Sequence, residues 1–325
     1  MSRIDNEGML MSDRVKPRRF QTIEHGDLRG VSALVVHQTD APTAQHTFNG
    51  YLAKGSGAHF LIEKNGVIYQ TASLRKRCYH VGRYLRSKCL ATDQAKCDTA
   101  QIQTIQALTW TLQIRALDRY ERTKDYPERY PMNADSLGIE LVGKHLDAAR
   151  YEEVTALQNL ALQWLVAELY GHFGLTPEDV YTHPQIAYKH PGEASSAVVA
   201  MSLRPWLFGV WVILAGCAAS PPDIDEISIS NFRSGEPERC RPSDVALDEG
   251  EIASFFKRAE PIDGRTLHDE YDWAPCYLEG TLKYRGKACI WRVRAGATGE
   301  IECPATALYF FGCKACGELF GGSTR

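Results

Sequence analysis

Two histidines lie close together on one proline-rich stretch of this chain. Residues 180–193 carry His183 and His190, and a proline directly follows each of them. Because proline lacks a backbone donor and restricts the residue before it, we expect a loop here and not a helix. Two imidazole nitrogens on one stiff loop are typical of half a tetrahedral zinc site. The spacing therefore predicts metal chemistry.

A further ligand has to come from another part of the chain, and His37 is the candidate. It directly follows the apolar run 31–36, which we interpret as a buried strand. Sites in α/β proteins collect at the carboxyl ends of such strands. Three protein ligands with one open coordination position are the pattern of a catalytic zinc and not of a structural zinc.

The elements around these residues alternate between strands and helices. Asn65-Gly66 separates two short apolar runs, which predicts a hairpin. Glu140 is the one charged residue of a short alternating run, so it either faces the surface or is catalytic. The expected strands are 31–36, 58–63, 67–71 and 137–142, and the expected helices are 43–54, 99–120 and 152–173.

The whole chain has the size and composition of about two soluble domains. It has 325 residues, a net charge of -3 and no basic block, so we expect no nucleic-acid binding. The first 20 residues are polar and lack the apolar core of an export signal, so we expect a flexible lead-in. We place the domain boundaries at 1–20, 21–195, 196–220 and 221–325.

A signal-like segment lies in the middle of the chain. Residues 201–217 begin with a methionine and an arginine, continue with an apolar core, and end in Leu-Ala-Gly-Cys. This layout resembles a bacterial lipoprotein signal, in which Cys217 would be lipidated and the 203–217 segment would anchor the protein to a membrane. The apolar run is shorter than the roughly 20 residues that a transmembrane helix needs.

The chain beyond this segment is rich in cysteine and has the alternation of short strands. We expect a small β-rich domain over 221–325, with up to three disulfides among its six cysteines and no derivable connectivity. Cys313 and Cys316 have the spacing of half a zinc ribbon. Because no second pair with that spacing exists, disulfide use is favoured over zinc.

Five motifs follow one another in residues 20–195: Leu34-Val-Val-His37, Ala58–Gln70, Tyr79-His-Val-Gly82, Leu137–Gly143 and Thr182-His with His190-Pro-Gly192. In this order they resemble the type-2 zinc N-acetylmuramoyl-L-alanine amidases, which share their fold with peptidoglycan recognition proteins. The resemblance implies an α/β fold with a mixed central sheet flanked by helices, and zinc in a groove that binds peptidoglycan or muropeptides.

The same resemblance implies a role for each site residue. His37, His183 and His190 match the zinc ligands, with His190 at a position that is usually aspartate or cysteine. Glu140 matches the catalytic glutamate, which acts alone because Ala58 stands where relatives often carry a tyrosine.

Three further residues each have two alternative roles. Lys189 lies one position away from the family's lysine, and we consider both an oxyanion-stabilising role and a solvated surface lysine. His59 and His80 either line the substrate groove or satisfy local hydrogen bonds.

The implied activity is hydrolysis of the amide between N-acetylmuramic acid and L-alanine of peptidoglycan. The alternatives are a recognition module that binds muropeptides without cutting them, and a chain whose functional part is the cysteine-rich half. The internal signal suggests an interbacterial toxin joined to its periplasmic lipoprotein immunity protein. The amidase would then stay in the cytoplasm until delivery and act in the periplasm, where its own C-terminal half would be the inhibitor.

Overall fold

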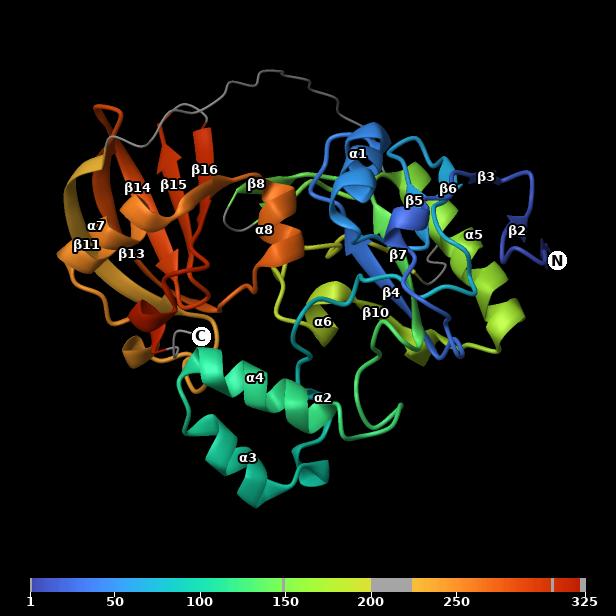
Figure 1. Cartoon of the computed structure of the whole chain (residues 1–325), viewed down its shortest axis with the longest axis horizontal. Helices are drawn as coiled ribbons and strands as arrows, with labels where there is room; N and C mark the ends of the chain where they lie inside the picture. Colours follow the sequence, from blue (N-terminus) through green and yellow to red (C-terminus); the bar gives the residue numbers. More distant parts are fainter. Residues whose placement is uncertain (1, 148–149, 200–223, 305–306, 322–325) are drawn as a thin grey trace. The chain divides into compact units, whose positions relative to one another are not determined.

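The computed structural model describes residues 2–147, 150–199, 224–304 and 307–321, which divide into two compact units (Figure 1). The first unit comprises Met1–Cys97 and Asp118–Arg204, and the second comprises Asp98–Leu117 and Pro205–Arg325. The sequence analysis placed residues 98–117 in one domain with the rest of 21–195. In the structure they group with the C-terminal part of the chain.

A mixed six-stranded sheet forms the centre of the first unit, as expected. Its strand order is β10-β4-β7-β5-β6-β3, with β6 antiparallel to β5 and the other neighbours parallel. The strands are β3 (Val15–Pro17), β4 (Ala33–Gln38), β5 (Phe60–Ile62), β6 (Ile68–Gln70), β7 (Ser136–Leu141) and β10 (Val180–Thr182).

Helices cover both faces of this sheet (Figure 1). Alternate residues of a strand point to opposite faces. Leu137, Ile139 and Leu141 of β7 pack in a core cluster with Leu162 and Leu165 of α5 (Ala156–Phe173). Leu61 of β5 points the other way, into a cluster with Tyr51 and Phe48 of α1 (Ala44–Lys54). The opposite face of β7 is thereby left to Ser136, Gly138 and Glu140.

The predicted helices have their expected boundaries, with two differences. Helix α1 is capped by Thr43 and ends at the left-handed Gly55. Helix α5 begins four residues later than expected because Thr155 and Gln158 form a capping box. The expected helix over 99–120 is divided into α3 (Thr99–Gln106) and α4 (Trp110–Glu121).

The expected flexible lead-in over 1–20 is wrong. Residues 3–17 form β1 (Arg3–Ile4), β2 (Leu10–Met11) and β3, and β3 completes the central sheet beside β6. Leu10 and Val15 are buried in the main core cluster. Two apolar side chains in a polar stretch are enough for docking here because β6 offers an edge on which β3 pairs.

Short elements complete the first unit. They are η1 (Gln21–Ile23), α2 (Lys88–Thr92), η2 (Gln94–Lys96), β8 (His145–Asp147), β9 (Arg150–Tyr151), η3 (Pro177–Asp179) and α6 (His183–Ile186). The loop expected around His183 is wrong, because residues 183–186 form helix α6. Pro184 lies in its first turn, where a backbone N–H has no intrahelical partner to lose.

The second unit contains an antiparallel six-stranded sheet, which confirms the expected β-rich domain. Phe256 of helix α7 packs edge-on against Trp291 and Phe311 of the sheet. The strand order is β11-β13-β14-β15-β16-β12. The elements are β11 (Ile224–Ser234), η4 (Pro242–Val245), α7 (Glu249–Arg258), β12 (Glu260–Ile262), α8 (Gly264–Glu270), β13 (Cys276–Tyr284), β14 (Lys287–Arg294), β15 (Thr298–Cys303), β16 (Ala307–Gly312) and η5 (Gly317–Phe320), together with α3 and the first part of α4.

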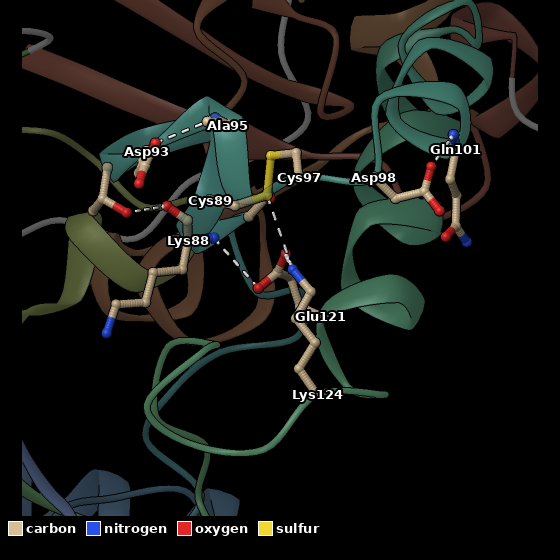
Figure 2. The surroundings of a disulfide bond; sticks show 11 residues. Lys88, Cys89, Asp93, Ala95, Cys97, Asp98, Gln101, Glu121 and Lys124 are labelled. Atoms are coloured by element: carbon tan, nitrogen blue, oxygen red, sulfur yellow. Dashed lines mark hydrogen bonds and ion pairs between the residues drawn. A yellow bond between two sulfur atoms is a disulfide. The ribbon is translucent and has the colours of Figure 1, made fainter.

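Four disulfides are present in the described residues. The six cysteines of the C-terminal part form Cys240–Cys276, Cys289–Cys303 and Cys313–Cys316, which confirms the expected number and the disulfide use of the last pair. Figure 2 shows a fourth, Cys89–Cys97, which joins α2 to the end of η2 in the first unit. Cys78 is a buried free thiol, and burial raises its pKa.

The signal-like segment, including Cys217 and the 203–217 stretch, lies outside the described residues. Within the described ranges, no helix combines the length and apolarity that crossing a membrane requires.

Candidate metal centre and its surroundings

His37 and His183 come together because their strands are neighbours. His37 lies near the carboxyl end of β4, and His183 follows β10, which pairs with β4 in parallel. The two imidazole rings lie 4.3 Å apart between centroids, and both side chains are buried. The structure therefore brings these two predicted ligands together.

The third member of the cluster is Glu193, which the sequence analysis did not select. Its Oε1 lies 2.9 Å from Nδ1 of His183 and 3.7 Å from Nδ1 of His37. One ligand atom from each of the three residues lies within 4.8 Å of the others. Two imidazoles and one carboxylate are a donor set that catalytic zinc uses, so the residues present fit this metal.

The hydrogen bonds of the two histidines turn their Nδ1 atoms toward the carboxylate. Nε2 of His183 lies 3.1 Å from the Val81 carbonyl, to which it donates, so Nδ1 carries the lone pair. Burial, together with the charges of His37 and Lys189, lowers the pKa of His183 to about 3, although Glu193 opposes this shift. The ring is therefore neutral at physiological pH, and its lone pair faces a carboxylate. A cation bound between the two would stabilise this arrangement.

His80 is hydrogen-bonded to the His37 ring at Nε2, the nitrogen that does not face Glu193. Its Nδ1 lies 3.1 Å from Nε2 of His37, and its Nε2 lies 3.4 Å from the Ser136 carbonyl. A chain of donation from His37 to His80 to Ser136 leaves Nδ1 of His37 as its ligating atom. Gly138 makes room for this contact, because a Cβ there would lie 2.8 Å from the His80 ring. His80 therefore satisfies local hydrogen bonds and orients a candidate ligand.

His59 is a structural histidine. Its Nδ1 accepts from the Gly138 N–H at 3.1 Å, and its Nε2 donates to the Lys76 carbonyl at 2.8 Å. The side chain is fully buried, and burial lowers its pKa to about 4. Both ring nitrogens of His59 are therefore hydrogen-bonded to backbone groups, which favours the local hydrogen-bond interpretation.

His190 does not join the candidate ligands. Its Nδ1 accepts from the Gly192 N–H at 2.9 Å, and its ring packs against His145 of β8 and Tyr151 of β9. The structure therefore does not bring His190 into the cluster of candidate ligands, and its assignment as the third ligand stays a prediction. The turn at Pro191-Gly192 brings Glu193 to the histidine pair instead, while the β8–β9 hairpin holds His190.

Glu140 is buried beside the metal candidates and does not face the surface. It is the register partner of His37 across β7 and β4, and residues paired in this way point to the same face of a sheet. The side chain is 5% exposed, and its Oε2 accepts a 2.8 Å hydrogen bond from the Tyr51 hydroxyl. Tyr51, on α1, is a second residue that sequence reasoning missed.

Lys189 points inward and is not a solvated surface lysine. It is 5% exposed. Gly82, with a left-handed φ of 90°, shows where its side chain lies: a Cβ there would come within 3.2 Å of Lys189 Cε and 3.4 Å of His183 Nε2. Lys189 thus brings a positive charge next to His183, as its effect on the His183 pKa also indicates.

A sequence signal existed for Glu193 but not for Tyr51. Glu193 is an acidic residue directly after His-Pro-Gly, and an acid near two candidate histidines is worth testing as a ligand. Tyr51 is one aromatic residue on an amphipathic helix, where a core position and a contact to Glu140 have the same pattern.

These features define a mixed α/β protein with a candidate metal centre of two histidines and one carboxylate. The model of the N-acetylmuramoyl-L-alanine amidase family, Amidase_2, matches residues 27–195, which is more than half of the chain. The chain belongs to this family. No curated protein sequence matches it.

Several solved structures resemble part of the chain. A selenomethionine derivative of AmpD is 22% identical, with 59% of this chain and 92% of that chain covered and a TM-score of 0.34. AmpDh3 from Pseudomonas aeruginosa, in complex with an anhydromuramic pentapeptide, is 18% identical, with 49% and 52% covered and a TM-score of 0.33. The Drosophila peptidoglycan recognition protein PGRP-SA is 15% identical, with 50% and 72% covered and a TM-score of 0.29.

Proposed function

We propose that the first unit is a zinc-dependent N-acetylmuramoyl-L-alanine amidase. It would hydrolyse the amide between the lactyl group of N-acetylmuramic acid and L-alanine in peptidoglycan or muropeptides. One observation carries the proposal: His37, His183 and Glu193 are buried and each offers a ligand atom within 4.8 Å of the others, in a chain that belongs to the amidase family.

The residues around that point have separate tasks. A bound zinc would lower the pKa of a water molecule and polarise the scissile carbonyl. Glu140 accepts the water proton and passes it to the leaving amine, and the Tyr51 hydroxyl holds its carboxylate in place. The buried ammonium of Lys189 stabilises the negative charge that develops on the carbonyl oxygen.

Metal content and peptidoglycan cleavage test this proposal together. Purified residues 1–194, which lack the C-terminal domain, should bind one zinc and release stem peptides, and chelation should stop the release. His183→Ala should lose both zinc and activity. Glu140→Gln should keep zinc while cleavage falls by about 10²–10⁴-fold, the usual worth of a positioned general base. An unchanged rate in Glu140→Gln would remove it from the mechanism.

A non-catalytic recognition module is the alternative within the same fold. The described site offers three candidate ligands, Glu140 and Lys189, which favours an enzyme. Muropeptide binding by zinc-loaded residues 1–194 without any cleavage would decide for the recognition module.

We also propose that the C-terminal domain is an inhibitor of this amidase in an interbacterial toxin–immunity pair. Its three disulfides suit an oxidising space such as the periplasm, where a peptidoglycan amidase acts. The amidase would remain in the cytoplasm until delivery. Lipidation at Cys217 would anchor the inhibitor to a membrane through the 203–217 segment.

Mixing the two halves tests the inhibitor proposal. Residues 218–325, oxidised and added in excess to residues 1–194, should form a complex and abolish peptidoglycan release, with a contact surface that includes His37, His183 and Glu140. Full activity at excess C-terminal domain, with no complex on a sizing column, would contradict it.

A further inference from the structure

The second unit is assembled from two parts of the chain that lie far apart in the sequence. Residues 98–117 fall inside the matched amidase region of 27–195, yet they group with the cysteine-rich C-terminal part. Ile102, Ile105 and Trp110 of this segment are buried. We call residues 98–117 the helical insert.

A pair of charged residues holds the turn between α3 and α4 of the helical insert. Nη2 of Arg241 donates to the Leu108 carbonyl at 2.6 Å, just after the end of α3. Oδ1 of Asp244 accepts from the Trp110 N–H at 3.1 Å, at the first residue of α4. Arg241 and Asp244 are joined to each other, since the Arg241 N–H donates to Oδ2 of Asp244 at 2.7 Å.

These contacts match the electrostatics of helix ends. The C-terminal end of a helix presents unpaired carbonyls and favours a cation, whereas the N-terminal end presents unpaired N–H groups and favours an anion. Arg241 supplies the positive charge after the end of α3, and Asp244 supplies the negative charge at the start of α4. Asp244 is 2% exposed, so without Trp110 its buried carboxylate would lose a donor.

Two further contacts join the helical insert to the C-terminal part of the chain. The Thr111 hydroxyl donates to the Ala295 carbonyl at 3.4 Å. A Cβ on Gly321 would lie 3.1 Å from the Thr109 methyl group, so the end of η5 lies directly against the turn. The partners of residues 108–111 thus come from three separate places in the C-terminal part.

The first unit fixes the chain at both ends of the helical insert. Cys97, directly before it, is disulfide-bonded to Cys89 (Figure 2). Asp118, directly after it, accepts the Leu85 N–H at 2.9 Å. The insert is therefore a loop held at its base, and loss of its partner surface would expose apolar side chains.

We propose that the helical insert is the docking element by which the amidase binds the cysteine-rich C-terminal domain, with the turn at 107–111 held by Arg241 and Asp244. The partner is the C-terminal domain, in the same chain or supplied as a separate polypeptide. This inference deepens the inhibitor pairing proposed above and rests on that pairing, but it needs no amidase activity.

Cutting the full chain tests the docking element. A recognition sequence for a specific protease is inserted between residues 200 and 223, and the oxidised protein is cut and passed over a sizing column. The wild-type halves should elute together. Arg241→Glu should raise their dissociation constant by about 10–100-fold, the worth of one charge-assisted hydrogen bond.

Arg239→Glu is the matched control. Arg239 and Arg241 flank the same cysteine and have side chains 25% and 36% exposed, but Arg239 pairs with Glu236 of its own domain. The control should bind as the wild type does. Wild-type halves that separate on cutting, or equal binding by Arg241→Glu and Arg239→Glu, would overturn the proposal.

Hydrogen exchange of the uncut chain distinguishes the local loss of this contact from a variant that fails to fold. In Asp244→Ala the Trp110 amide should exchange at least tenfold faster, while the amides of the β13–β14 pair keep their protection. An unchanged exchange rate of the Trp110 amide would count against its hydrogen bond to Asp244 as part of the docking element. Absence of peptidoglycan cleavage by residues 1–194 alone would count against the amidase proposal and not against the docking element.

Discussion

At the residue scale, the third candidate ligand in the structure differs from the one that the sequence predicted. Glu193 faces Nδ1 of His183, whereas His190 is bonded to Gly192. We therefore expect Glu193→Ala to lose nearly all bound zinc and His190→Ala to keep about one equivalent. Metal analysis of the dialysed proteins by mass spectrometry measures this. Zinc retained by Glu193→Ala but lost by His190→Ala would restore the original assignment.

His59 makes the stability of the first unit sensitive to acid. Its folded-state pKa is about 4, and its ordinary value is 6.5. Between these values the unfolded chain binds a proton that the folded one does not, so the free energy of unfolding falls as the pH falls. The loss from pH 7 to 4 should reach about 3 kcal/mol for this residue.

The His59→Asn variant isolates that contribution, because asparagine does not titrate. Urea unfolding at a series of pH values should show a shallower acid loss in the variant than in the wild type. Parallel curves for the two proteins would show that His59 is not the cause.

At the element scale, the Cys89–Cys97 disulfide should stabilise the segment that leads to α3. It closes a loop with a sequence separation of 8 residues next to the ion pair of Glu121 and Lys124 (Figure 2). Loop-closure entropy predicts a contribution of about 2.5 kcal/mol. Replacing both cysteines with serine should lower the free energy of unfolding by about that amount, as measured by urea denaturation.

Cys78→Ala is the control for the loss of sulfur. This thiol is buried but unbridged, so its removal should cost about 1 kcal/mol without changing the closed loop. Equal losses in the two variants would mean that packing, and not loop closure, accounts for the effect.

At the scale of the whole molecule, the helical insert should depend on the C-terminal domain. Ile102, Ile105 and Trp110 of the insert are buried, and the turn at 107–111 is hydrogen-bonded to residues more than 130 positions away. In a chain ending at residue 199, amides of 98–117 should exchange at least a hundredfold faster than in the full chain. The central sheet should keep its protection, which serves as the internal control. Protection of 98–117 without the C-terminal domain would show that the insert is stable alone.

The elements that the sequence predicted correctly have local physical causes. Apolar runs, the Asn65-Gly66 turn and the glycines after α1 and α5 act through backbone preferences and alternation, which adjacent residues determine. His37 and Glu140 were identifiable because each ends or interrupts an apolar strand. The amidase family was recognisable for the same reason: its motifs are short stretches in a defined order.

Tertiary structure alone decided the remaining features. Whether His190 or Glu193 faces His183 depends on a turn and on a hairpin at 145–151, neither of which the local pattern encodes. The lead-in became a strand because β6 offered an edge, and 98–117 joined the second unit because Arg241 and Asp244 bind its helix ends. The sequence by itself determined the family, the position of His37 near the end of a strand and the disulfide-rich second domain. Long-range packing decided which side chains meet, because such contacts depend on where distant segments dock.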